Sequence, residues 1–267
     1  MHHRFIIYLL LSLLVQVIWA QEEAIMDCHY ALDYRPNLDK KTRRKDEMVL
    51  RLSRSSSMFF SRWCWERQAI KDSLFSRGAS LGEVMDAIER SGYPLSTLFT
   101  IIYKDYPQEG VFTTTDILVS LDLICTEDRH EPQWEISEEK QEILGYNCQK
   151  AVAQYYGREW TVWFTTEIPF SDGPWKLHGL PGLILQAEDA AREFIFTCIE
   201  LRETKASIAI AKKKYIVCSK DELDKLEIEY RTNDTKFRKK RDMPYAKPVS
   251  EEPGYLPPDR IFNYIER

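Results

Sequence analysis

The chain has 267 residues, with 42 acidic and 37 basic side chains and a formal net charge of −5. Nucleic-acid affinity depends largely on neutralising phosphates, so a mildly acidic chain argues against a nucleic-acid partner. With 44% hydrophobic and 12% aromatic residues, the chain can build a sizeable core, which argues against disorder of the whole.

The first twenty residues are typical of a Sec-type signal peptide. A short basic start ending at Arg4 precedes an apolar run over residues 5–15, and Ala20 offers a small residue for cleavage. The alternative is a retained membrane anchor, but this run is shorter than the ~20 apolar residues needed to span a bilayer. We therefore expect an exported protein, periplasmic or associated with the outer membrane, with no transmembrane segment in the mature chain.

All six cysteines follow the expected leader, and an oxidising compartment would allow them to pair. Fifteen complete pairings are possible for six cysteines, and spacing alone does not choose among them. Cys198 and Cys218 fall in neighbouring predicted strands, so they are the first candidates for a disulfide. The alternative is that several cysteines are buried free thiols.

A β-hairpin is expected at the start of the mature chain. Alternating positions rich in β-formers predict strands at residues 28–34 and 46–52. The basic run at residues 40–45 between them is typical of a solvated loop, with contact to an anionic partner as the alternative. A short strand is expected at residues 57–61.

A helical insert is expected over about residues 66–92. Its first helix, residues 67–75, is weakly indicated. Its second helix begins at the capping box Ser80-x-x-Glu83, which precedes apolar residues at helical spacing, and Gly92 ends it.

Strands dominate the sequence from residue 98 onward. Trp160, Val162 and Phe164 alternate with the residues between them, which is typical of a strand with one buried face. Such strands favour an antiparallel sheet that packs mainly through one side. We therefore predict an α+β fold in which a large, curved, half-barrel-like antiparallel sheet carries a few inserted and C-terminal helices. The strands expected here are residues 98–104, 111–123, 146–155, 159–165, 180–187, 193–201 and 207–218.

The last part of the sequence combines one more helix with a tail. A second capping box, Ser219-x-x-Glu222, marks the helix start. Basic residues crowd together from Lys236, and five prolines follow, which disfavours regular structure. We therefore expect a loosely attached, basic and Pro-rich tail at residues 236–267, within which residues 261–265 are apolar enough to dock.

Residues 173–185 place two tight-turn signals around Trp175, directly before a fully apolar strand. Gly179 and Gly182 give the backbone freedom that other residues lack, and Pro181 fixes its own φ. The structural interpretation is a strand entry that locks the sheet, and it depends on Gly173, Pro174, Gly179 and Gly182.

A functional interpretation of the same turn is the rim of an apolar cavity. Long antiparallel hairpins with inserted helices look like the half-barrel of periplasmic lipoprotein carriers, whose sheet wraps around helices or an apolar ligand; this likeness concerns architecture alone. The candidate ligand-binding residues are Trp163, Trp175, Lys176, His178, Leu180, Pro181 and Leu183.

The motif resembles the GLPGLI family of exported proteins from Bacteroidota, whose name-giving hexapeptide stands here at residues 179–184. The resemblance covers roughly residues 25–205 and implies one β-rich domain at residues 21–235. The family has no agreed activity to carry over. Departures are the helical insert, the additional cysteines and the tail. Further matching segments are residues 143–151, 157–165 and 167–176.

Candidates for catalysis are few. The sequence has no HExxH, histidine cluster, EF-hand loop or P-loop, so neither a metal nor a cofactor is expected. Ser80 lies in a GxSxG match, but a nucleophile elbow needs a preceding strand, and Ser80 is explained as a helix cap. For His178 and the pair Glu188 and Asp189, roles in polar turns are expected. No catalytic residue is assigned.

Three functions remain open. We favour a non-catalytic envelope protein that binds an apolar ligand, a peptide or an outer-membrane partner. The second is a structural or assembly accessory of an outer-membrane receptor or transporter, docked through the tail at residues 236–267. The third is a hydrolase-type enzyme, which needs a pocket that holds His178 next to a carboxylate and a serine or cysteine.

Overall fold

The computed structural model describes residues 22–38, 40–119, 121–243 and 265–266. The expected leader lies outside the described residues, and so does most of the expected tail. The described elements, in chain order, are β1 (Glu22–Glu23), β2 (Met26–Tyr34), β3 (Arg44–Leu52), β4 (Ser57–Ser61), α1 (Arg62–Phe75), α2 (Leu81–Arg90), β5 (Ile101–Lys104), β6 (Val111–Leu118), β7 (Leu121–Asp128), β8 (Glu135–Ile143), β9 (Tyr146–Tyr155), β10 (Arg158–Thr165), β11 (Leu183–Asp189), β12 (Phe194–Glu203), β13 (Ser207–Ile208), β14 (Ile216–Val217), α3 (Lys220–Thr232) and α4 (Asp234–Lys240).

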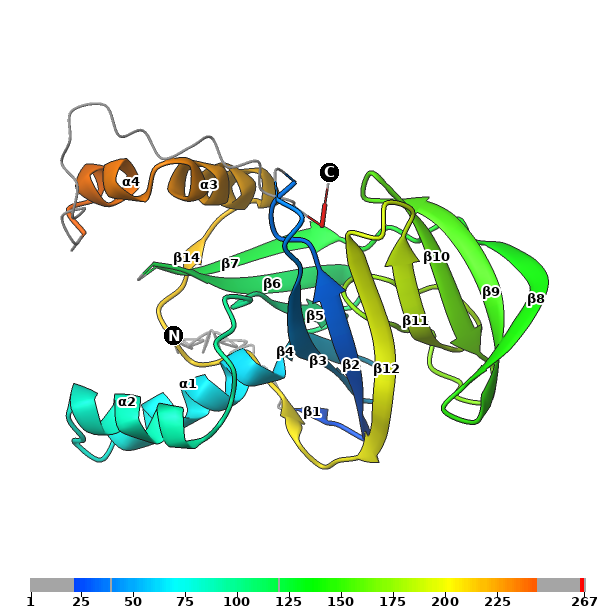
Figure 1. Ribbon diagram of the computed structural model, residues 1–267, viewed down its shortest axis with the longest axis horizontal. Helices are drawn as coiled ribbons and strands as arrows, with labels where there is room; N and C mark the ends of the chain where they lie inside the picture. Colours follow the sequence, from blue (N-terminus) through cyan, green and yellow to red (C-terminus); the bar gives the residue numbers. More distant parts are fainter. Residues whose placement is uncertain (1–21, 39, 120, 244–264, 267) are drawn as a thin grey trace, which may run out of the picture.

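The main sheet has twelve described strands in the order β14-β7-β6-β5-β4-β3-β2-β12-β11-β10-β9-β8. Every pair in it is antiparallel except β14 with β7. Figure 1 shows the sheet bending strongly, without closing into a barrel, since β14 and β8 are its two edges. The predicted α+β fold with a large curved antiparallel sheet is confirmed.

Alternating side chains build the main core on one face of the sheet. Trp160, Val162 and Phe164 of β10 are at most 1% exposed, as their spacing predicted. In the middle of the sheet, Leu50 and Phe59 belong to this core, whereas their neighbours in β3 and β4 pack into a smaller cluster on the opposite face. The packing is therefore dominated by one side.

Two strand predictions need correction, and one strand was missed. Residues 111–123 form β6 and β7 rather than one strand, because the chain reverses where Val119 adopts a φ of 63°. The expected strand at residues 207–218 contains only the two-residue strands β13 and β14. The charged edge strand β8 has too few apolar residues for a strand pattern, which is why its sequence did not predict it.

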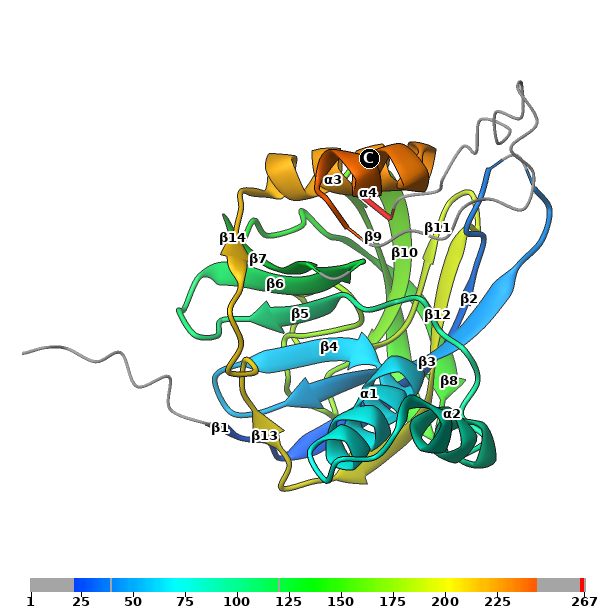
Figure 2. The same cartoon turned by 90° about the vertical axis from the view of Figure 1, so that its left-hand side faces the viewer.

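Helices α2 and α3 begin where the caps predict, whereas α1 begins at Arg62, before the predicted start at residue 67. Ser80 and Ser219 each form a complete capping box, with the side-chain and backbone hydrogen bonds both present. Residues of the expected tail form α4, whose Phe237 is fully buried. The pairs α1–α2 and α3–α4 lie apart from each other, below and above the sheet in Figures 1 and 2. None of the described helices has the length and apolar character to span a membrane.

The predicted disulfide is wrong. All six cysteines lie in the described part of the chain and all six are free thiols. Cys198 of β12 lies opposite Tyr30 in the middle of the sheet, whereas Cys218 follows β14 at one edge. The sequence placed them in consecutive strands, but six strands separate β12 from β14 in space.

Candidate functional site

Most of the GLPGLI-type motif is packed in the main core. Trp175, Leu180 and Leu183 belong to it, and Lys176 is 1% exposed. Pro181 is exposed, and Trp163 is half-buried and packs against the core. A Cβ atom on Gly182 would overlap the carbonyl group of Thr165 in the neighbouring strand. These positions fit the strand-entry interpretation, and His178 alone among the candidate rim residues lines a described pocket.

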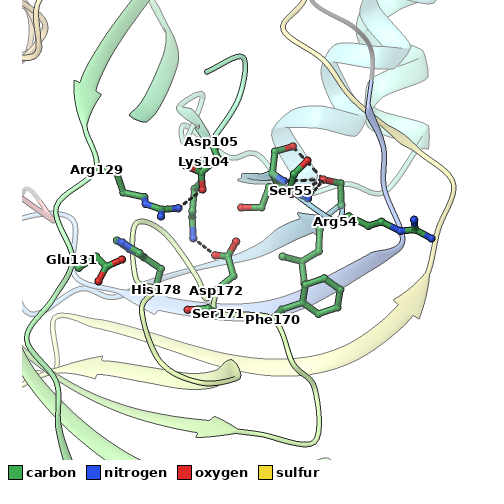
Figure 3. Close-up of a pocket in the computed structure, with 14 residues that line it drawn as sticks. Arg54, Ser55, Lys104, Asp105, Arg129, Glu131, Phe170, Ser171, Asp172 and His178 are labelled. Atoms are coloured by element: carbon green, nitrogen blue, oxygen red, sulfur yellow. Dashed lines mark hydrogen bonds and ion pairs between the residues drawn. The ribbon is translucent and has the colours of Figure 1, made fainter. Parts of the chain in front are cut away.

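This pocket has a volume of about 200 Å³ and lies at the start of β4 and the end of β5. Figure 3 shows the residues that line it. Sheet register builds its floor, because Ser57 of β4 pairs with Lys104 of β5, and Lys104 pairs with Phe112 of β6. The turn after β3, residues 53–56, forms one wall. The opposite wall is the segment from Phe170 to His178.

The serine turn is held by its own hydroxyl groups. The Ser53 hydroxyl donates to the carbonyl oxygen of Ser56 at 2.9 Å and accepts from the Ser56 backbone N–H at 2.9 Å. The hydroxyls of Ser55 and Ser56 donate to the carboxylate of Glu22. The turn therefore presents a polar and fixed wall.

Lys104 is 2% exposed, and its ammonium group donates hydrogen bonds to the wall opposite the serine turn. Its ammonium group forms an ion pair with Asp172 and donates to the carbonyl oxygens of Gly173 at 2.7 Å and Leu177 at 3.3 Å. Burial lowers the pKa of Lys104, and the Asp172 carboxylate opposes that effect. Lys104 thus anchors the segment that carries His178.

Charges in the pocket are balanced. Arg129 forms an ion pair with Asp105, beside the pair of Lys104 and Asp172 (Figure 3). Three basic and three acidic side chains line the pocket in total, and they are Arg54, Lys104, Arg129, Asp105, Glu131 and Asp172.

His178 is 3% exposed and is fixed from two sides. Its Nδ1 lies 2.8 Å from the carbonyl oxygen of Lys176, and its own carbonyl oxygen accepts from Trp134 Nε1 at 2.7 Å. The ring packs edge-on against Phe112 and Tyr155. Burial lowers the pKa of His178, the bond to Lys176 opposes this, and the nearby charges of Lys104 and Arg129 lower it further.

Two buried polar atoms of the pocket residues have no hydrogen-bond partner in the described part of the chain. They are the hydroxyl oxygen of Ser57 and Nε2 of His178. With Nδ1 donating to Lys176, Nε2 carries a lone pair and can accept a hydrogen bond. Buried polar groups in folded proteins are normally paired with protein or with ordered water, so these two atoms leave hydrogen-bonding capacity that a ligand or water can use.

The other candidates from the sequence lie elsewhere. Ser80 caps α2. Glu188 pairs with Arg192, whereas Asp189 is buried, not solvated as expected for a turn, and pairs with Arg158.

Sequence reasoning missed the remaining pocket residues. Lys104, at the end of an apolar strand, was the one detectable signal, because a lysine on a core-facing position needs a partner. Asp172 and Arg129 lie on loops without any pattern.

Two solved structures of PNGF-II, in different space groups, are similar to this chain. The first superposes with a TM-score of 0.50 and 12% identity, over 76% of this chain and 32% of that one. The second superposes with a TM-score of 0.48 and 14% identity, over 77% of this chain and 32% of that one. This chain thus spans about a third of their length. Among curated proteins, no sequence matches this chain.

The family profile described as "N-glycanase peptide, N-terminal domain" (PNGase F-II) matches residues 93–231, more than half of the chain. This match overturns the assignment to the GLPGLI family, and the hexapeptide at residues 179–184 is therefore a local likeness within a different family. The chain belongs to the family of the PNGase F-II N-terminal domain.

Proposed function

We propose that this protein is a non-catalytic binding domain whose pocket takes up a neutral, hydroxyl-bearing group, such as one sugar residue. The observation that carries the proposal is the pair of unpartnered buried atoms, Ser57 Oγ and His178 Nε2, on residues of one pocket. Hydroxyl groups suit both atoms, because a hydroxyl can donate to Nε2 and can exchange a hydrogen bond with a serine.

Charge supports a neutral ligand. The charged side chains that line the pocket are balanced, and four of them are already used in two ion pairs. An anionic or cationic ligand would have to compete with these pairs and pay for its own desolvation. A neutral polar group avoids both costs.

Size supports a small group. Pockets that enclose a whole small molecule measure roughly 300–1,000 Å³, whereas this pocket measures about 200 Å³. The pocket therefore suits one ring at the end of a larger ligand. Phe170, which is half-buried at the pocket wall, adds an apolar surface to the pocket.

The family description is consistent with a sugar ligand. It names the N-terminal domain of an N-glycanase, and the core of an N-linked glycan consists of neutral, hydroxyl-bearing rings. Non-catalytic binding in the envelope agrees with the function favoured from the sequence, although the polar pocket favours a polar ligand over an apolar one. Export and envelope localisation remain predictions, as does docking to an outer-membrane partner.

The hydrolase alternative has one observation in its favour. His178 lines a pocket that also contains Asp172 and several serines. However, His178 Nδ1 bonds to a backbone carbonyl instead of a carboxylate, and no described hydroxyl donates to its Nε2. A serine nucleophile needs that base within hydrogen-bond reach, although such bonds are often looser without substrate. We therefore place binding before catalysis.

Isothermal titration calorimetry with N,N′-diacetylchitobiose tests the proposal, with lauric acid as the apolar comparison. We expect chitobiose to bind and lauric acid not to bind. Ser57→Ala should weaken binding about tenfold, the loss expected for one buried hydrogen bond of ~1–1.5 kcal/mol. Phe170→Ala should also weaken binding. Phe99→Ala, which removes an exposed ring from a different loop, is the matched control and should bind as the wild type.

Failure of chitobiose to bind contradicts the proposal. If lauric acid binds and chitobiose does not, the ligand is apolar, as one of the sequence-based alternatives expects. Unchanged affinity in Ser57→Ala places any sugar site elsewhere on the molecule.

A further inference from the structure

The carboxylate of Glu266 lies between two lysines from distant parts of the chain. Its Oε1 is 2.5 Å from Nζ of Lys176, and its Oε2 is 2.9 Å from Nζ of Lys220. Lys176 belongs to the motif before β11, and Lys220 is the first residue of α3. Each carboxylate oxygen therefore meets its own cation, which gives charge-assisted hydrogen bonds on both sides.

The residue before it is recognised through its backbone and its side chain. Nε of Arg158 donates to the carbonyl oxygen of Ile265 at 2.8 Å, and the Ile265 side chain packs against the main core. Such a bond to a main-chain carbonyl does not depend on the side chain that is bound. The dipeptide is thus held by three kinds of contact: a backbone carbonyl, an apolar side chain and a carboxylate.

Each of the three cations also has partners other than the dipeptide. Lys176 is 1% exposed, pairs with Glu127 and lies 4.5 Å from the centre of the Tyr156 ring. Lys220 pairs with Asp224 on its own helix. The positions of these cations are therefore built into the fold.

Arg158 is equally well fixed. Its guanidinium is 3% exposed and pairs with Asp189 at 2.7 Å and with Glu193 at 2.8 Å. Its Nη1 serves both carboxylates, while Nε is the atom that meets the peptide carbonyl.

We propose that Arg158, Lys176 and Lys220 form a recognition site for a short peptide in which an apolar residue precedes an acidic one. In this structure the chain's own Ile265 and Glu266 occupy the site. A segment with the same two-residue pattern on a partner protein competes for it. This inference is independent of the sugar pocket and of its ligand.

The test uses the full chain with Glu266→Lys, which places a positive charge against the two lysines and disables the internal occupant. The probe is a fluorescein-labelled peptide with blocked ends and the sequence of residues 262–266, followed by fluorescence anisotropy. We expect the variant to bind this peptide at least tenfold more tightly than the wild type, whose site is filled. The same peptide with glutamine in place of its glutamate should bind the variant at least tenfold more weakly.

Two further variants control the experiment. Lys220→Ala, added to Glu266→Lys, should remove peptide binding, because it removes one of the two cations that meet the glutamate. Lys220 is half-buried, so its loss should leave the core intact. Glu89→Lys reverses an exposed charge on α2, which lies apart from α3, and should behave as the wild type. Glu266→Ala replaces Glu266→Lys if thermal melting shows that charge reversal disturbs the fold.

Two results overturn the inference. If the peptide does not bind to a folded Glu266 variant, the three cations are not a recognition site. If the peptide binds equally to the wild type and the variant, Ile265 and Glu266 do not occupy the site where the peptide binds.

Discussion

The Nδ1 atom of His178 lies 2.8 Å from the carbonyl oxygen of Lys176, and this contact determines which ring nitrogen stays available to the pocket. A carbonyl oxygen only accepts, so Nδ1 carries the proton and Nε2 has the lone pair. Burial, together with the charges of Lys104 and Arg129, lowers the pKa of the ring and keeps this neutral form. The site is therefore prepared for a hydrogen-bond donor on its ligand.

A pH dependence of stability follows from His178. Its pKa in the folded state is below the ordinary value of 6.5, so the unfolded chain binds more protons between those two values. The free energy of unfolding therefore rises with pH through that window, by at most ~1.4 kcal/mol per pH unit, and is level above pH 6.5 as far as this group is concerned. Urea unfolding of the wild type and of His178→Phe at several pH values should give a difference with this slope. A difference that does not change with pH contradicts the assignment.

Two glycines of the motif should differ sharply in their tolerance of a methyl group. Gly182→Ala places a Cβ against the backbone of Thr165 and should cost about 3 kcal/mol or more, since two paired strands must move apart. Gly179 has a φ of 87° with its nearest neighbours at 3.7 Å, so Gly179→Ala should cost only the ~1–2 kcal/mol of the left-handed conformation. Denaturant midpoints measure both, and equal losses would contradict the strand-entry interpretation.

Removing Asp172 should expose the cost of a buried lysine. In Asp172→Asn, the Lys104 ammonium stays buried without its counter-charge, and we expect the free energy of unfolding to fall by about 3 kcal/mol. The double variant Lys104→Met with Asp172→Asn removes both charges and should regain at least half of this loss. If the loss of stability in the double variant equals the sum of the losses in Asp172→Asn and Lys104→Met, the two side chains are not coupled.

The hydroxyl groups of Thr113 and Thr114 are buried and unpartnered among the described residues. Replacing Thr113 by Val keeps the shape of the side chain and removes a hydroxyl group that is buried without a partner. The free energy of unfolding should therefore stay level or rise by about 1 kcal/mol. Thr100→Val is the matched control, because the Thr100 hydroxyl donates to Asp116 at 2.5 Å and its loss should destabilise. Thermal melting distinguishes the two, and a large loss in Thr113→Val means that its hydroxyl has a partner.

Local patterns predicted much of the fold. The alternation around Trp160 and the capping boxes at Ser80 and Ser219 report on contacts within a few residues, and the structure has strands and helices at those places. The reversal after β6 was missed because Val119, at a φ of 63°, is an unusual residue for a turn. Edge strand β8 was missed because its side chains are mostly charged and exposed on both faces.

The pocket was beyond sequence reasoning, apart from His178. Ser57 and Lys104 are 47 positions apart and become neighbours only through the register of β4 and β5. Asp172 joins them from a loop whose path depends on the packing of Trp175 and Leu177 in the core. Long-range register and loop packing leave no periodic signal in the sequence. The turns of the motif could be predicted, because glycine and proline mark them locally.

The place of β2, β3 and β4 in the sheet has a consequence for any shortened version of this protein. The family match begins at residue 93, after these strands, yet they lie between β5 and β12 in the middle of the sheet. A fragment made of residues 93–231 would consist of two separate β-sheet pieces, each with an unprotected edge, and would be prone to aggregate. The smallest independently folding unit therefore has to include strands that the family profile does not reach.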